Sequence, residues 1–331
     1  MADLKTKYMG LELRSPIIAG SCGLTSDVEK MVEMEKAGVG AVVLKSIFEE
    51  QINEETSGVF KAGYGMGDAY PEAEDYIKTY IRSNTIQKYV ELVRNAKSRL
   101  TIPVIASVNC FSGGEWISFA SQLEEAGADA LELNVFILPV NEFRESAEVE
   151  NVYFEIVKSI KSQIKIPVSV KISHYFTNLS AFVDKIKAYG ANATTLFNRF
   201  YEPDININTL EMGAASVFST AAELRTTLRW TGILAGKDKK LEISASTGVH
   251  GGEAAVKLLL AGATTVQVCS VLYEKGIHVI EDINNFVGKW MDSKAFKTIE
   301  DYRGMLSYSS IENPDLYERA QFMKYFSNKQ Y

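Results

Sequence analysis

The chain has 331 residues, of which 46% are hydrophobic and 23% charged, a composition typical of a globular protein with a large core. A formal net charge of −7, without a run of Lys and Arg, argues against nucleic acid as a partner. Neither a secretory leader nor an apolar span of about 18 residues is present, so we expect a cytoplasmic protein with no membrane address. The three cysteines, Cys22, Cys110 and Cys269, are few and far apart, as expected in a reducing compartment.

Short apolar runs recur along the whole chain. Four of them follow a helix end and a glycine, at residues 37–45, 126–134, 189–198 and 261–269. The other four lie at residues 15–21, 102–109, 166–173 and 241–248. Between these strands we expect helices at residues 26–37, 85–99, 116–126, 147–163, 178–189, 220–230 and 251–261. The alternation predicts a (β/α)8 TIM barrel of the α/β class. An open doubly wound sheet is the alternative, although its glycine fingerprint is missing after the first strand.

Two connections are longer than plain barrel loops require. Residues 46–84 follow the second predicted strand, and residues 199–219 follow the sixth. Because both leave the carboxyl end of a strand, we expect them to form a lid or rim over the barrel mouth. Residues 273–331 should add C-terminal helices. We therefore expect residues 1–331 to form a single barrel domain.

Polar side chains stand at the carboxyl ends of the predicted strands, where a barrel brings its loops together. These residues are Ser21, Lys45, Asn109, Asn134, Lys171, Asn198, Thr247 and Ser270. Glu132 is a further polar residue inside an apolar run, and the stretch after Asn134 is unusually apolar. The pattern predicts a catalytic or binding site at the mouth, in preference to ordinary polarity where strands meet loops.

The segment STGVHGGEAA, residues 246–255, is rich in glycine and opens a predicted helix. Backbone N–H groups in such a segment can hold a phosphate without a basic side chain. Barrels commonly bind phosphate between the loops after strands seven and eight, here Thr247–Gly248 and Cys269–Ser270. A simple glycine-rich turn is the alternative reading of the segment.

Several of these segments together carry a family resemblance. They are LKS at 44–46, ELN at 132–134, VKIS at 170–173, STGVHGGEAAVKLLLAGATTVQV at 246–268 and TIEDYRGMLS at 298–307. In this order and spacing they resemble the dihydroorotate dehydrogenase family of FMN-dependent barrels over nearly the whole chain.

The resemblance implies an FMN site built from the strand ends. Residues beside the flavin would be Ala19, Gly20, Ser21, Lys45 and Ser46. The flavin ring, or a substrate stacked on it, would be bound by Asn109, Asn134 and Asn198. Lys171 would lie near the flavin N1 and C2 carbonyl, where a cation stabilises the anionic reduced ring. The phosphate would be held by Thr247, Gly248, Cys269 and Ser270.

The chain departs from the family pattern where the substrate should bind. Ile137 stands where the family has its Cys or Ser base, and Pro139 and Tyr64 stand where it has substrate-binding asparagines. Arg199 follows Asn198 in place of Ser or Thr. The candidates for a relocated base are Cys110, His174, Tyr64 and Cys22. We therefore expect a retained FMN site beside an altered substrate site.

We expect an FMN-dependent oxidoreductase that transfers hydride between flavin N5 and a small planar substrate, which need not be dihydroorotate. Its expected catalytic residues are Lys45, Lys171, Asn134 and His174, and no metal is expected. A Schiff-base aldolase using Lys171 or Lys45 is one alternative. A flavin-binding protein that has lost turnover is another. The sequence leaves open both a homodimer and a partner electron-transfer subunit.

Overall fold

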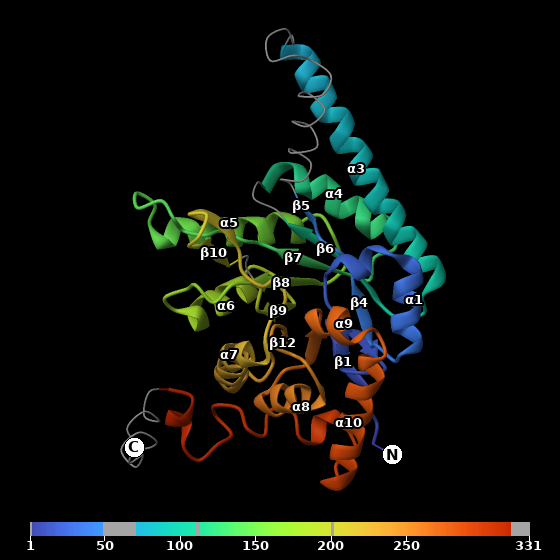
Figure 1. Cartoon of the computed structure of the whole chain (residues 1–331), viewed down its shortest axis with the longest axis vertical. Coiled ribbons are helices and arrows are strands. Elements are labelled where there is room, and N and C mark those ends of the chain that lie inside the picture. Colours follow the sequence, from blue (N-terminus) through green and yellow to red (C-terminus); the bar gives the residue numbers. More distant parts are fainter. Residues whose placement is uncertain (1, 49–70, 110–112, 200–201, 319–331) are drawn as a thin grey trace.

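The computed structural model describes residues 2–48, 71–109, 113–199 and 202–318, and eight parallel strands in these segments form a closed barrel (Figure 1). In order around the barrel they are β3 (Ile17–Ala19), β4 (Ala41–Val43), β6 (Val104–Asn109), β7 (Ala130–Asn134), β8 (Val168–Ile172), β9 (Ala193–Leu196), β12 (Glu242–Ala245) and β13 (Thr265–Val268). The last strand pairs with the first, Val266 opposite Ile17, and this pairing closes the barrel. The predicted (β/α)8 barrel is confirmed, and the open doubly wound sheet is wrong.

The barrel strands are buried on both faces. Every residue of β6, β7, β8 and β9 is buried. Helices cover the outer face of a parallel barrel and side chains fill its inside, so such strands appear in a sequence as continuous apolar runs. Polar residues within these strands are therefore the exceptions that need an explanation.

Helices cover the outside of the barrel. They are α1 (Val28–Lys36), α3 (Pro71–Arg99), α4 (Gly113–Glu125), α5 (Ser146–Lys161), α6 (Leu179–Ala188), α7 (Leu224–Lys237), α8 (Gly252–Ala261), α9 (Ser270–Lys275) and α10 (Val279–Ser293). Two predicted boundaries are wrong. The helix expected at 85–99 already begins at Pro71, a residue that suits the first helical position because its missing N–H costs no bond there. The helix expected at 220–230 is a 3-10 turn, Ala221–Glu223, followed by α7, which extends to Lys237.

An antiparallel hairpin, β1 (Thr6–Tyr8) and β2 (Leu11–Leu13), fills the amino end of the barrel. Its turn residues Met9 and Gly10 both have positive φ, as a tight hairpin of this kind requires. Tyr8 and Leu13 join a buried cluster with the inward-facing residues of the surrounding strands, including Ile18 and Ile105. The hairpin therefore acts as a plug that closes the barrel opposite the predicted site.

Short strands also follow two of the barrel strands at the carboxyl end. After β4, the strand β5 (Ile47–Phe48) pairs with the end of β6. After β9, an exposed hairpin consists of β10 (Pro203–Asn206) and β11 (Glu211–Ala214). Residues 49–70, within the predicted insertion 46–84, lie outside the described part of the chain.

The end of the chain packs beside the barrel. From Phe296 to Glu318 the described residues form turns and two 3-10 turns, Ile299–Asp301 and Pro314–Leu316, so α10 is the one long helix of the predicted helical tail within the described residues. No helix among the described residues is both long enough and apolar enough to cross a membrane.

Candidate active site

The carboxyl ends of the strands surround a cavity of about 460 Å³. Its lining includes residues from five barrel strands or the loops that follow them. The predicted site residues among them are Ser21, Lys171, Asn198, Thr247, Gly248, Cys269 and Ser270. These side chains are far apart in the sequence, so the closed barrel is what brings them together.

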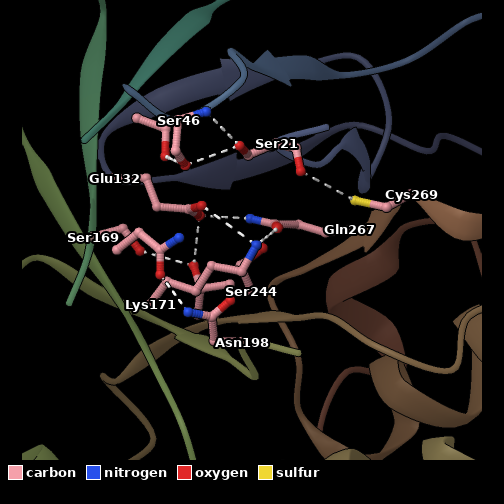
Figure 2. A network of polar contacts seen from close by, with 12 residues as sticks. Ser21, Ser46, Glu132, Ser169, Lys171, Asn198, Ser244, Gln267 and Cys269 are labelled. Carbon is pink, nitrogen blue, oxygen red and sulfur yellow. Dashed lines mark hydrogen bonds and ion pairs between the residues drawn. The ribbon is translucent and has the colours of Figure 1, made fainter. Parts of the chain in front are cut away.

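A buried carboxylate organises a network of polar contacts that includes Lys171 and Gln267 of the cavity lining (Figure 2). Glu132, on β7, is 1% exposed, and its Oε2 accepts hydrogen bonds from Thr195 Oγ1 at 2.9 Å and from Gln267 Nε2 at 2.8 Å. Lys171 Nζ lies 3.6 Å from Glu132 Oε1 and donates to Gln267 Oε1 at 3.3 Å. The ammonium group of Lys171 is thus held between a carboxylate and an amide oxygen. A buried charge is stable only when it is paired in this way.

The network continues from Glu132 toward the amino-end plug. Thr195 Oγ1 lies 3.0 Å from Ser169 Oγ, and Ser169 Oγ accepts a hydrogen bond from the Tyr8 hydroxyl at 3.1 Å. Burial raises the pKa of Tyr8 above its usual value, so this hydroxyl stays neutral and remains a donor. The polar interior of the barrel is therefore one connected chain from the plug to the cavity lining.

Three serines link the strands on the other side of the cavity. Ser21 Oγ lies 3.0 Å from Ser46 Oγ and accepts a hydrogen bond from the Ser46 backbone N–H at 2.9 Å. Ser46 Oγ is in turn 2.7 Å from Ser107 Oγ. The neighbouring Gly20 has no space for a side chain, because a Cβ there would lie 2.6 Å from Cys269 Sγ. Close packing of β3 on β13 therefore explains the glycine.

The three predicted asparagines occupy different environments. Asn198 Nδ2 donates to Asn134 Oδ1, which joins the loop after β9 to the end of β7. Asn109, at the end of β6, is 4% exposed, and its Oδ1 has no hydrogen-bond partner among the described residues. Buried amide oxygens normally have a partner. Asn109 Oδ1 is therefore a candidate for contact with a ligand.

The predicted phosphate loops meet at one edge of the cavity. Thr247 and Gly248 both have positive φ, 81° and 79°. A Cβ on Gly248 would lie 2.2 Å from the backbone nitrogen of Leu224. The close approach of α7 is therefore a sufficient reason for glycine at this position. Ser270 Oγ accepts from the backbone N–H of Ser219 at 2.9 Å, which fastens the loop after β13 to the segment before α7.

Two free thiols lie beside each other in the cavity lining. Cys22 and Cys269 share a hydrogen bond that lowers the pKa of Cys22 to about 6. The same hydrogen bond, together with burial, raises the pKa of Cys269 well above its usual value. Cys22 is therefore the thiol that ionises first, and thiolates are the reactive form of cysteine.

Some predicted residues lie elsewhere. Lys45 is exposed and lines neither this cavity nor the next. His174 lines a second cavity of about 570 Å³ that adjoins the first, and loss of hydration lowers the pKa of its imidazole. Ile137 packs against the core, and Ala19 is fully buried in it. The base candidates Tyr64 and Cys110 fall outside the described residues.

Sequence reasoning did not assign Glu132, Gln267 and Arg199 to the site. Glu132 and Gln267 are polar residues inside buried strands, and this is the signal that could have identified them. Arg199 lines both cavities, and its Nε donates to Glu223 Oε2 at 2.9 Å. Its partner comes from the turn before α7, which the sequence pattern does not connect with it.

A cavity at the carboxyl mouth with a paired buried cation in its lining lies where enzymes of the (β/α)8-barrel class hold their active sites. The family model for dihydroorotate dehydrogenase matches residues 3–291, so the chain belongs to the dihydroorotate dehydrogenase family. Members of this family are flavoproteins, and the chain is an oxidoreductase of the same type.

Curated relatives cover almost the whole chain. One is "Dihydroorotate dehydrogenase B (NAD(+)), catalytic subunit" of Thermoplasma acidophilum, which is 29% identical over 311 residues, 92% of this chain and 99% of that protein. Another is "Putative dihydroorotate dehydrogenase A (fumarate)" of Aeropyrum pernix, 26% identical over 322 residues, 91% of this chain and 97% of that protein. A third, named like the first and from Methanocaldococcus jannaschii, is 22% identical over 312 residues, again 91% of this chain and 97% of that protein.

Proposed function

We propose that this chain binds FMN in the 460 Å³ cavity and oxidises or reduces a small planar substrate other than dihydroorotate. The observation that carries the proposal is the contrast between the end of strand β8 and the loop after β7. Lys171 is 6% exposed and fixed by Glu132 and Gln267, whereas the loop after β7 offers Ile137 where the family has its base. We further propose that the protein works in the cytoplasm, where the free thiols Cys22 and Cys269 stay reduced.

The residues of the cavity suit FMN. Hydroxyl and amide groups of Ser21, Asn198 and Ser270 line it, and the free Oδ1 of Asn109 lies at the end of a neighbouring strand. The ammonium group of Lys171 supplies positive charge where an anion would otherwise be unfavourable. When bound, FMN would supply the two-electron hydride chemistry that no side chain can provide. No dinucleotide fingerprint follows the first barrel strand, which favours FMN over FAD.

Residue 137, in the loop after β7, is an isoleucine, and its side chain cannot accept a proton. A positioned base typically contributes about 10²–10⁴-fold to such a reaction. Of the candidate bases that the structure describes, Cys22 lines the first cavity and His174 lines the second. Since its pKa is lowered, His174 is neutral at pH 7 and can accept a proton.

The Schiff-base alternative is less well supported. A lysine that forms a Schiff base must reach the substrate carbonyl with its nitrogen, whereas Lys171 Nζ is already held by Glu132 Oε1, 3.6 Å away, and by Gln267 Oε1 at 3.3 Å. Borohydride trapping with an aldehyde or ketone should therefore leave Lys171 unmodified.

The test begins with the absorbance spectrum of the purified protein, which should show bound flavin. Stopped-flow mixing with dihydroorotate should then reduce the flavin very slowly, while dithionite or photochemical reduction proceeds normally. An Ile137→Val variant is the matched control and should behave like the wild type, because both side chains lack a base. A colourless protein that takes up no FMN would refute the cofactor assignment. Rapid reduction that disappears in His174→Ala would refute the exclusion of dihydroorotate.

A further inference from the structure

The second cavity, of about 570 Å³, is continuous with the proposed FMN cavity. Phe197, Asn198, Arg199 and Thr247 line both. A ring bound in the second cavity would therefore lie next to whatever occupies the first. The residues that line the second cavity therefore determine which substrate fits beside the flavin.

Apolar and aromatic groups form much of its wall. Phe136 and Leu138 come from the apolar loop after β7, and Tyr175 and Phe197 follow β8 and β9. The His174 ring lies 4.4 Å from the ring of Tyr175, centroid to centroid, and meets Phe197 edge-on at 5.7 Å. Such walls favour a flat ring. They also explain why the sequence after Asn134 is so apolar.

The charged groups of the second cavity are mostly acidic. Among the described residues that line it, Glu202 and Glu223 are acidic, Arg199 is basic, and His174 is neutral at pH 7. One positive and two negative groups leave a formal charge of −1.

Arg199, the one cation among the described residues of this lining, is already engaged. Arg199 Nε donates to Glu223 Oε2 at 2.9 Å, and Nη1 donates to the carbonyl oxygen of Val217 at 2.9 Å. Nη2 lies 3.8 Å from Glu202 Oε2. A ligand carboxylate would have to compete with two carboxylates of the protein for this guanidinium group.

We infer that the second cavity selects an uncharged planar ring and rejects a ring that carries a carboxylate, such as orotate. The inference rests on the proposed function, because the ring must lie against a flavin in the first cavity. Glu223 is 28% exposed and Glu202 is 63% exposed, so solvent screens part of their charge, and together the two carboxylates should weaken the binding of an anionic ring about tenfold. Selection therefore comes from repulsion as well as from the apolar wall.

The experiment compares orotate with its methyl ester, which has the same ring and no charge. Each is titrated into the FMN-loaded protein while the flavin absorbance is recorded. We expect the dissociation constant of the ester to be at least about tenfold lower than that of orotate. Glu202→Gln removes one negative charge and leaves Arg199 paired with Glu223, so the preference should fall to about threefold. Glu12→Gln is the matched control, because Glu12 is exposed on the plug hairpin and should leave the preference unchanged.

The possible outcomes distinguish a failure of the FMN assignment from a failure of the selection of an uncharged ring. A protein that takes up no FMN refutes the proposed function itself. A yellow protein that binds orotate as tightly as the ester, or binds neither, refutes the selection of an uncharged ring and leaves the cofactor assignment standing. A preference that persists unchanged in Glu202→Gln also overturns the inference, because the charge would then have no part in it.

Discussion

The pairing of Glu132 with Lys171 predicts a strong energetic coupling between these two residues. Their side chains are 2% and 7% exposed, and the charged atoms are 3.6 Å apart. Replacing Glu132 by Gln keeps the shape but leaves the ammonium group buried without its counter-charge. Breaking a buried ion pair from one side costs about 3–5 kcal/mol of the free energy of unfolding. Lys171→Met should cost a similar amount, since it strands the carboxylate instead.

The double variant, Glu132→Gln with Lys171→Met, contains no buried charge at this site. Its loss of stability should therefore fall short of the sum of the two single losses by about 2–3 kcal/mol. Urea unfolding followed by circular dichroism measures all three variants against the wild type. Thr195→Val is the control, because it removes the hydroxyl that bonds Glu132 and Ser169 but leaves both charges in place, and it should cost about 1.5–3 kcal/mol. Additivity of the two single variants within about 0.5 kcal/mol would show that the pair is not coupled.

Three further predictions concern the cavity lining. Lys171→Met should lower the flavin midpoint potential by about 30 mV or more, equal to 1.4 kcal/mol for a two-electron couple, and an unchanged potential in a spectroelectrochemical titration would place the lysine away from the ring. Gly248→Val should lower the melting temperature and cost about 2 kcal/mol or more, because its Cβ meets the α7 backbone at 2.2 Å, whereas Gly251→Val, with nothing within 4 Å, should cost far less; equal losses would contradict this. Alkylation of Cys22 should accelerate with pH around a midpoint near 6, and Cys269→Ser should move that midpoint up toward the ordinary thiol value; a midpoint that does not move would exclude the shared hydrogen bond.

The barrel could be predicted from the sequence because its signals are local. Each repeated segment places a glycine just after a helix, and Gly38, Gly127, Gly190 and Gly262 all adopt positive φ, at 93°, 97°, 110° and 118°. Short apolar runs then mark the strands. Once parallel strands close into a barrel, their polar carboxyl ends must share one mouth, so the approximate position of the site followed as well.

The contacts inside the site could not be predicted in the same way. Glu132 and Gln267 meet across the barrel, from strands that are not neighbours, so no periodicity connects them. The partner of Arg199 depends on how the turn before α7 packs. The role of Gly248 also depends on packing. The sequence suggested a glycine needed for phosphate binding, whereas in the structure the backbone of Leu224 leaves no room for a Cβ at this position.

Closure of the barrel by β3 and β13 determines when the protein can fold during its synthesis. The chain is translated from the plug hairpin and β3 onward, but the strand that completes the pairing ends only at Val268. At about 5–20 residues per second, the ribosome needs roughly ten to fifty seconds to make the intervening chain. For that time one edge of β3 has no partner, and Tyr8 and Leu13 have no closed barrel to fill. The first barrel strand to be made is thus fully paired only when the last barrel strand is made, and until then its open edge is the surface that a chaperone bound to the nascent chain would protect.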